Sequence, residues 1–166
     1  MEIVVRPAEL KDVSCILEII NYEILNTTVV YDYQTRTYEQ QLNWFRQKQR
    51  DNQPIIVAEM NGDVIGFGTY GSFRPREAYK FSIEHSIYIN AKYRGTGVGK
   101  ILMRKLIGLA KQQGYHTMIA GVDGSNKGSV EFHKKFGFTE VGHIKEVGYK
   151  FDKWLDLVFL QLILTE

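Results

Sequence analysis

The stretch from residue 81 to residue 102 constrains the fold more than any other part of the chain. Apolar and polar residues alternate over residues 81–89, and a period of two predicts a β-strand. Residues 94–99 read Arg-Gly-Thr-Gly-Val-Gly, which places three glycines within five positions. From Val98 onward, apolar residues recur at the spacing of one helix face. The stretch therefore predicts a strand, a glycine-rich turn and a helix in direct succession.

A turn of this kind, at the N-terminus of a helix, suits an anionic ligand. The first N–H groups of a helix lack partners within it, and the helix dipole places roughly +0.5 charge there. Glycine lets the backbone approach a phosphate closely and adopt positive φ angles. Two common phosphate loops do not fit. A Walker loop needs a glycine where the chain has Arg94, and a dinucleotide fingerprint needs one at Lys100.

The remaining elements follow from periodicity and turn signals. Helical spacing is seen over residues 13–25, 38–50 and 125–137. Strands are expected at residues 3–5, 55–60, 64–70, 116–122, 139–144 and 153–164, although periodicity alone does not exclude a helix for the last run. The order β-α-α-β-β-β-α-β-α-β-β predicts an α/β fold in which helices flank a mixed, largely antiparallel sheet.

Composition narrows the class of protein. At 166 residues the chain is expected to form one domain, residues 1–166. A net charge of +2 argues against nucleic acid as the main partner. The single cysteine, Cys15, excludes an internal disulfide and favours a reducing, cytoplasmic setting. We expect no signal peptide, no membrane-spanning segment and no metal, because His116 and His143 lack metal-ligand spacing.

Two signatures resemble the GNAT N-acetyltransferase superfamily. The turn Arg94-x-x-Gly97-x-Gly99 resembles its pyrophosphate loop, and Asn126 with the following helix resembles its second signature. The element order is similar over nearly the whole chain. A narrower resemblance, to the phosphinothricin acetyltransferase family, is carried by Phe73-Arg74-x-Arg76-x-Ala78-Tyr79, Ile83-Glu84, Gly148-Tyr149-Lys150, Trp154 and Asp156.

This resemblance implies an enzyme that uses acetyl-CoA to acetylate, and so detoxify, glutamine-like amino-acid analogues at the α-amino group. The chain departs from phosphinothricin-specific members at two positions, where Phe151 and Leu155 replace histidines. That variant is similar to relatives that favour methionine sulfoximine and methionine sulfone, and an apolar wall there would disfavour the anionic phosphinothricin. Relatives in this family are commonly dimers, so a homodimer is expected.

The resemblance also implies which residues bind acetyl-CoA. Amides of the turn would hold the pyrophosphate, and backbone groups at the strand end would pair with the pantetheine arm. Asn126 could contact that arm or only cap its helix. The predicted cofactor-binding residues are Ile87, Tyr88, Ile89, Arg94, Gly95, Thr96, Gly97, Val98, Gly99, Lys100 and Asn126.

Glu84 and His133 are the catalytic candidates. Glu84 would act as general base, through a water, on the amine; alternatively it is a solvated or salt-bridged sheet carboxylate. His133 occupies the position where many GNAT members carry the tyrosine that protonates the leaving thiolate; alternatively it is a core histidine held by one hydrogen bond. His85 lies on the opposite face of the strand and is expected to be structural.

Arg74 and Arg76 are the candidates for binding a substrate carboxylate, because guanidinium groups match carboxylates with two hydrogen bonds. Tyr79 and Phe151 could form walls of the side-chain pocket. In isolation, the arginines would be two solvated loop cations, and each aromatic residue could equally be ordinary core.

Other functions within the same fold stay open. The acceptor could be a polyamine, against which the two arginines argue, or a protein N-terminus. A non-catalytic acyl-CoA sensor would keep the glycine turn and lose the base, so Glu84 weighs against it.

Overall fold

The computed structural model describes residues 2–165, and its element order is the predicted one. The helices are α1 (Val13–Asn26), α2 (Tyr38–Arg50), α3 (Val98–Gln112) and α4 (Lys127–Lys134). Short 3-10 turns are η1 (Leu10–Asp12), η2 (Glu77–Tyr79) and η3 (Ala91–Tyr93). The strands are β1 (Val4–Pro7), β2 (Ile55–Met60), β3 (Asp63–Ser72), β4 (Ser82–Ile89), β5 (Thr117–Asp123), β6 (Thr139–Lys150) and β7 (Lys153–Ile163).

The strands form one seven-stranded sheet in the order β1-β2-β3-β4-β5-β7-β6. Within the part of the chain described, only β4 and β5 run parallel as neighbours, and every other pair is antiparallel. The prediction of a mixed, largely antiparallel sheet is therefore confirmed, and the uniformly apolar closing run is a strand. Strand β6 continues to Lys150, well past the predicted end at residue 144, because it pairs with β7 across two register shifts.

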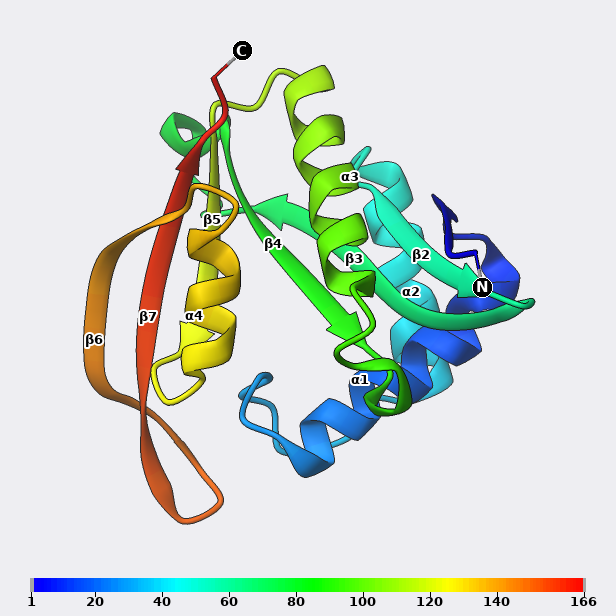
Figure 1. Cartoon of the computed structure of the whole chain (residues 1–166), viewed down its shortest axis with the longest axis horizontal. Helices are drawn as coiled ribbons and strands as arrows, with labels where there is room; N and C mark the ends of the chain where they lie inside the picture. The colour runs from blue at the N-terminus through cyan, green and yellow to red at the C-terminus, as the bar shows by residue number, and fades with distance from the viewer. Residues whose placement is uncertain (1, 166) are drawn as a thin grey trace.

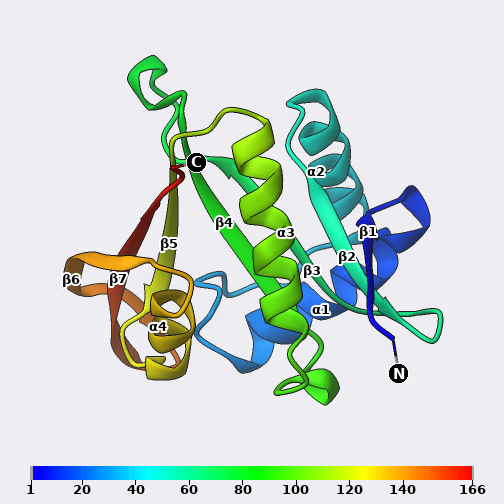
Figure 2. The same ribbon diagram turned by 45° about the horizontal axis from the view of Figure 1, so that its top comes forward.

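Helices cover both faces of the sheet (Figures 1 and 2). One face packs against α3 and α4, and the other packs against α1 and α2. Strand β2 shows why its run is apolar throughout: Ile56 and Ala58 belong to the α3 side, whereas Ile55 and Val57 belong to the α1 side. None of the helices in residues 2–165 is long and apolar enough to span a membrane.

The sheet opens between β4 and β5. These strands pair only over Ser82, Ile83 and Glu84, which lie beside Thr117 to Ile119. Beyond that point β4 stays with β3 up to Ile89, while β5 stays with β7 to Asp123. The strands diverge in Figures 1 and 2. The opening exposes one edge of each strand and is where the candidate site lies.

Candidate active site

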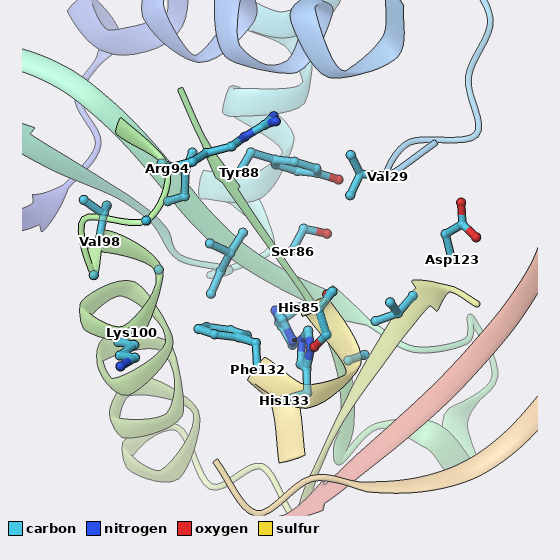
Figure 3. A pocket seen from close by; sticks show the side chains of 18 of the residues that line it. Val29, His85, Ser86, Tyr88, Arg94, Val98, Lys100, Asp123, Phe132 and His133 are labelled. Atoms are coloured by element: carbon cyan, nitrogen blue, oxygen red, sulfur yellow. Dashed lines mark hydrogen bonds between the residues drawn. The ribbon is translucent and has the colours of Figure 1, made fainter. Parts of the chain in front are cut away.

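A cavity of about 410 Å³ fills the opening between β4 and β5. It is lined by the second half of β4, the turn before α3, the end of β5 and one face of α4 (Figure 3). The loop after α1 adds Val29. Of the predicted cofactor-binding residues, the lining includes Ile87, Tyr88, Ile89, Arg94, Gly95, Gly97, Val98, Gly99 and Lys100. Thr96 is not among the lining residues; its hydroxyl donates to the Tyr93 carbonyl at 2.6 Å.

The glycine turn has the backbone that the sequence predicts. Gly95 and Gly97 have φ angles of 79° and 90°, and a Cβ at either would meet no other atom within 4 Å. Gly97 is the N-cap of α3 and supplies no side-chain acceptor. Among the described residues, the amides of Val98 and Gly99 have no hydrogen-bond partner. Open space and free donors at a helix N-terminus fit a phosphate group.

The Arg94 side chain is bound to the protein rather than free for a ligand. Its guanidinium forms an ion pair with the buried carboxylate of Glu23 in α1, and it lies 5.8 Å from the centre of the Tyr22 ring. The other carboxylate oxygen of Glu23 accepts from the Thr27 hydroxyl at 2.8 Å. Sequence reasoning missed Glu23, although an acidic residue beside the apolar stripe of α1 was a usable signal.

Glu84 lies at the point where β4 and β5 separate. It shares a strand face with Tyr88, which packs on the α1 side of the sheet. Burial raises the pKa of the Glu84 carboxyl, and the positive charge of Arg74 opposes that rise. The structure therefore brings Arg74 and Glu84 together, and it places Glu84 just outside the cavity lining. A carboxyl with a raised pKa at the end of a cleft is suited to accept a proton.

The other predicted substrate-binding residues divide into two groups. Arg74 and Tyr79 both contact Phe73: the Arg74 guanidinium lies 4.5 Å from the ring centre, and the Tyr79 ring packs edge-on at 5.8 Å. Arg76 is the N-cap of η2 and is exposed, as is Tyr79. These residues lie in the β3–β4 connection, close to the start of β4.

Phe151 lies at the opposite end of the sheet. Glu84 is level with Ile119, which pairs with Gln161 in β7, and Phe151 precedes Gln161 by ten positions. Ten residues of strand span roughly 33 Å. Phe151 is in the β6–β7 turn (Figure 1). Within a single chain, sheet register therefore separates Phe151 from Arg74, and the role of Phe151 as a pocket wall stays a prediction.

His133 pairs with His85 inside the cavity wall. Their Nε2 atoms are 2.9 Å apart, and Nδ1 of His133 lies 2.7 Å from the Ser129 carbonyl oxygen. A carbonyl only accepts, so Nδ1 of His133 carries a proton and its Nε2 accepts from Nε2–H of His85. Desolvation lowers the pKa of both rings, to about 3 for His85. Both nitrogens of His133 therefore have partners within the protein.

Asn126 is the N-cap of α4. Its side-chain oxygen accepts from the Ser129 amide at 3.1 Å, and the residue is not among those that line the cavity. Sequence reasoning missed Asp123, a buried carboxylate at the end of β5 that lines the cavity and accepts from the Thr28 hydroxyl. The residues described, 2–165, hold no cluster of three or more His, Cys, Asp or Glu side chains that could bind a metal ion.

The arrangement can be compared with known proteins. The profile of the Acetyltransferase (GNAT) family matches residues 19–138. This chain belongs to the GNAT acetyltransferase family. The match begins within α1 and includes the glycine turn, so it spans every residue that lines the cavity.

Curated GNAT relatives align with almost the whole chain. The L-methionine sulfoximine/L-methionine sulfone acetyltransferase of Salmonella typhimurium is 35% identical over 162 residues, which cover 98% of this chain and 95% of the relative. The phosphinothricin N-acetyltransferase of Streptomyces viridochromogenes is 29% identical over 157 residues, which cover 95% of this chain and 85% of the relative.

Solved GNAT structures agree equally well. An N-acetyltransferase from Staphylococcus aureus Mu50 has a TM-score of 0.98 at 48% identity, covering 99% of this chain and 100% of that chain. A putative acetyltransferase from Salmonella typhimurium, solved with its cofactor acetyl-CoA, has a TM-score of 0.97 at 34% identity and covers 100% of this chain and 96% of that chain.

Proposed function

We propose that this GNAT enzyme uses acetyl-CoA to acetylate the α-amino group of a small amino-acid analogue. Methionine sulfoximine and methionine sulfone are the best candidates, and phosphinothricin is the weaker one. The observation that carries the proposal is the opening in the sheet, which begins at Glu84 and ends at the glycine turn. The anion site at one end suits the pyrophosphate of a long donor, and the carboxylate at the other end suits the amine that would receive the acetyl group.

The residues at the cavity fit the donor at both ends. The free amides of Val98 and Gly99 would hold the pyrophosphate, and the open edge of β4 from Ile87 to Ile89 would pair with the pantetheine arm. Acetyl-CoA supplies an activated thioester carbonyl. Holding that carbonyl and the amine face to face removes several kcal/mol of entropic barrier.

Glu84 is proposed as the general base. An α-amino group ordinarily has a pKa of about 8, so a modest proton acceptor is enough to supply free amine at neutral pH. A raised pKa moves the carboxyl toward the working pH, where a base is most effective. Arg74 would hold the substrate carboxylate beside this group, with Arg76 as a second cation in the same loop.

His133 is a weaker proposal as the acid for the leaving thiolate, because both of its nitrogens already have partners. A proton delivered directly from water is the simpler route. The replacement His133→Asn separates the two roles: a general acid would cost roughly 10²-fold or more in kcat, and a packing residue would chiefly lower the melting temperature.

We also propose a cytoplasmic homodimer with a detoxifying role. The β6–β7 hairpin exposes a set of large apolar side chains that a second copy would cover: Val141, Ile144, Val147, Tyr149, Phe151 and Trp154. Sedimentation at several concentrations would measure the dimer directly. The detoxifying role follows from the substrate named for the 35% identical relative.

A thiol-release assay tests the substrate proposal. Methionine sulfone, methionine sulfoximine and phosphinothricin would be compared at matched concentrations, with spermidine and a peptide with a free N-terminus as controls. We expect the two methionine analogues to exceed phosphinothricin by at least about tenfold in kcat/KM. Faster turnover of phosphinothricin would reverse the ranking, and activity on spermidine alone would exclude the amino-acid class. If the protein binds acetyl-CoA tightly but releases no CoA thiol in the presence of any of these amines, a non-catalytic sensor would be favoured.

A further inference from the structure

The loop after α1, residues 27–33, contributes Val29 to the wall of the cavity and contains no strand or helix of its own. Val29 is the loop residue that lines the cavity, opposite His85 and Ser86 (Figure 3). A wall built from a loop needs other contacts to keep its place. Hydrogen bonds to α1, β5 and the β6–β7 hairpin hold this loop, and those of the hairpin involve Tyr149, Lys150 and Asp156.

A buried lysine of the hairpin makes two of these contacts. Lys150, the last residue of β6, is 3% exposed. Its Nζ donates to the Thr27 carbonyl at 2.8 Å and to the Val30 carbonyl at 2.6 Å. The two acceptors flank Val29 on both sides along the chain. The Phe151 ring covers the ammonium, with its centre 5.1 Å from Nζ.

A buried ammonium is a costly way to fill this space. No carboxylate in residues 2–165 lies within ion-pair distance of Lys150, so carbonyl groups and a ring are its main partners. Desolvation lowers the pKa of the Lys150 ammonium, and the negative charges of Asp32 and Glu23 oppose that shift. An apolar side chain would leave the carbonyls of Thr27 and Val30 without this donor, so the ammonium is the group that ties both to the hairpin.

The backbone beside Lys150 is also unusual. Phe151 and Asp152, the two residues of the β6–β7 turn, have φ angles of 51° and 58°. This left-handed pair is typical of a tight hairpin turn but unfavourable for a phenylalanine. The strained turn presents both the ammonium and the ring that covers it. Further hairpin contacts hold the same loop, since the Tyr31 hydroxyl donates to the Asp156 carbonyl at 2.9 Å.

We propose that Lys150 is a positioning residue whose ammonium holds the carbonyls of Thr27 and Val30, and thereby Val29, in the wall of the active-site cavity. The kinetic part of this inference rests on the proposed function. The structural part, the placement of residues 27–33, stands without it.

The test compares Lys150→Met, which keeps the apolar stem, with Lys150→Arg, which keeps charge and donors, and with Lys153→Met as the matched control. Lys153 is the exposed register partner of Lys150 across the same turn. We expect Lys150→Met to fold and to lose roughly 10- to 100-fold in kcat/KM for the amine, because the wall shifts by about 1 Å. Its acetyl-CoA dissociation constant should stay within about threefold, since the free amides of the glycine turn are unchanged. Lys150→Arg should recover part of the loss, and Lys153→Met should match the parent enzyme.

Hydrogen exchange gives a readout that needs no substrate. Amides of residues 28–33 should exchange at least about tenfold faster in Lys150→Met than in the parent enzyme or in Lys153→Met. Unchanged exchange or unchanged kcat/KM in a folded Lys150→Met variant would overturn the positioning role. If exchange is faster in Lys150→Met but the parent enzyme acetylates no amino acid, the positioning role of Lys150 would stand and the proposed function would be rejected.

Discussion

Glu84 is the residue on which the proposed chemistry depends most. It lies where β4 leaves β5, and burial raises the pKa of its carboxyl while Arg74 limits that rise. The same burial that makes Glu84 a better proton acceptor makes its charged form costly to the fold. Activity and stability should therefore respond to this side chain in opposite directions.

The activity of Glu84→Gln should depend on pH. Glutamine keeps the size and loses the proton acceptor, so kcat/KM should fall by roughly 10²- to 10⁴-fold near pH 7, where the amine is mostly protonated. The deficit should shrink above about pH 9, where free amine is abundant. Rates measured across this range provide the check, and a profile parallel to that of the parent enzyme would remove Glu84 from the mechanism.

The stability of Glu84→Gln should change in the opposite sense. Because the folded-state pKa is raised, the folded protein holds this proton more tightly than the unfolded chain. The contribution of Glu84 is therefore complete below the ordinary pKa of a glutamate and is lost as pH rises through the folded-state pKa. We expect Glu84→Gln to be more stable than the parent enzyme at about pH 8, with a smaller gain at about pH 4. Thermal melts at both pH values measure this, and an equal difference at the two would contradict it.

At the scale of elements, the turn that leads into α3 is the proposed binding site for the pyrophosphate of the donor. Gly95 and Gly97 have positive φ angles and open space where a Cβ would be, and the amides of Val98 and Gly99 are free. The ion pair between Arg94 and Glu23 attaches the turn to α1. The turn thus combines a prepared backbone with an anchored side chain.

Gly97→Val should weaken acetyl-CoA binding by at least about tenfold, because the side chain enters the space over the free amides. The positive φ angle adds a folding cost of about 1–2 kcal/mol. Gly108 is the matched control, since it lies in the same helix with open space around it. Gly108→Ala should leave acetyl-CoA affinity unchanged and raise stability by about 0.5–1 kcal/mol. Calorimetry with acetyl-CoA measures both variants, and normal affinity in Gly97→Val would refute the cofactor site.

At the scale of the whole molecule, the opening between β4 and β5 divides the sheet into two parts that are joined over a short stretch of pairing. One part carries β1 to β4 and the other carries β5 to β7. A ligand in the opening would contact both, so donor binding should stabilise the fold as a unit.

Saturating acetyl-CoA should therefore raise the melting temperature. At about 100 times its dissociation constant, a ligand that binds only the folded state adds about 2.7 kcal/mol, which corresponds to roughly 5–10 °C for a domain of this size. Differential scanning fluorimetry with acetyl-CoA, against acetate at equal concentration, measures the shift. No shift at millimolar acetyl-CoA would count against the donor assignment.

The sequence by itself determined the element order, the sheet class and the glycine turn. These depend on local properties: the period of apolar residues along a strand or helix, and the ability of Gly95 and Gly97 to adopt positive φ angles. A resemblance in the same stretches identified the family that the profile match then confirmed.

Only the tertiary structure decided which side chains meet. Sheet order and register separate Phe151 from Arg74, although both occur in motifs of the same resemblance. Packing brings Arg94 into an ion pair with Glu23 and His133 into a hydrogen bond with His85. It also places Lys150 within hydrogen-bond distance of the loop that contains Val29. Such contacts join residues far apart in the chain, and they depend on strand neighbours and on the face from which each side chain projects. The local period of apolar residues specifies neither the strand neighbours nor which side chains meet, because both are set by how the elements pack.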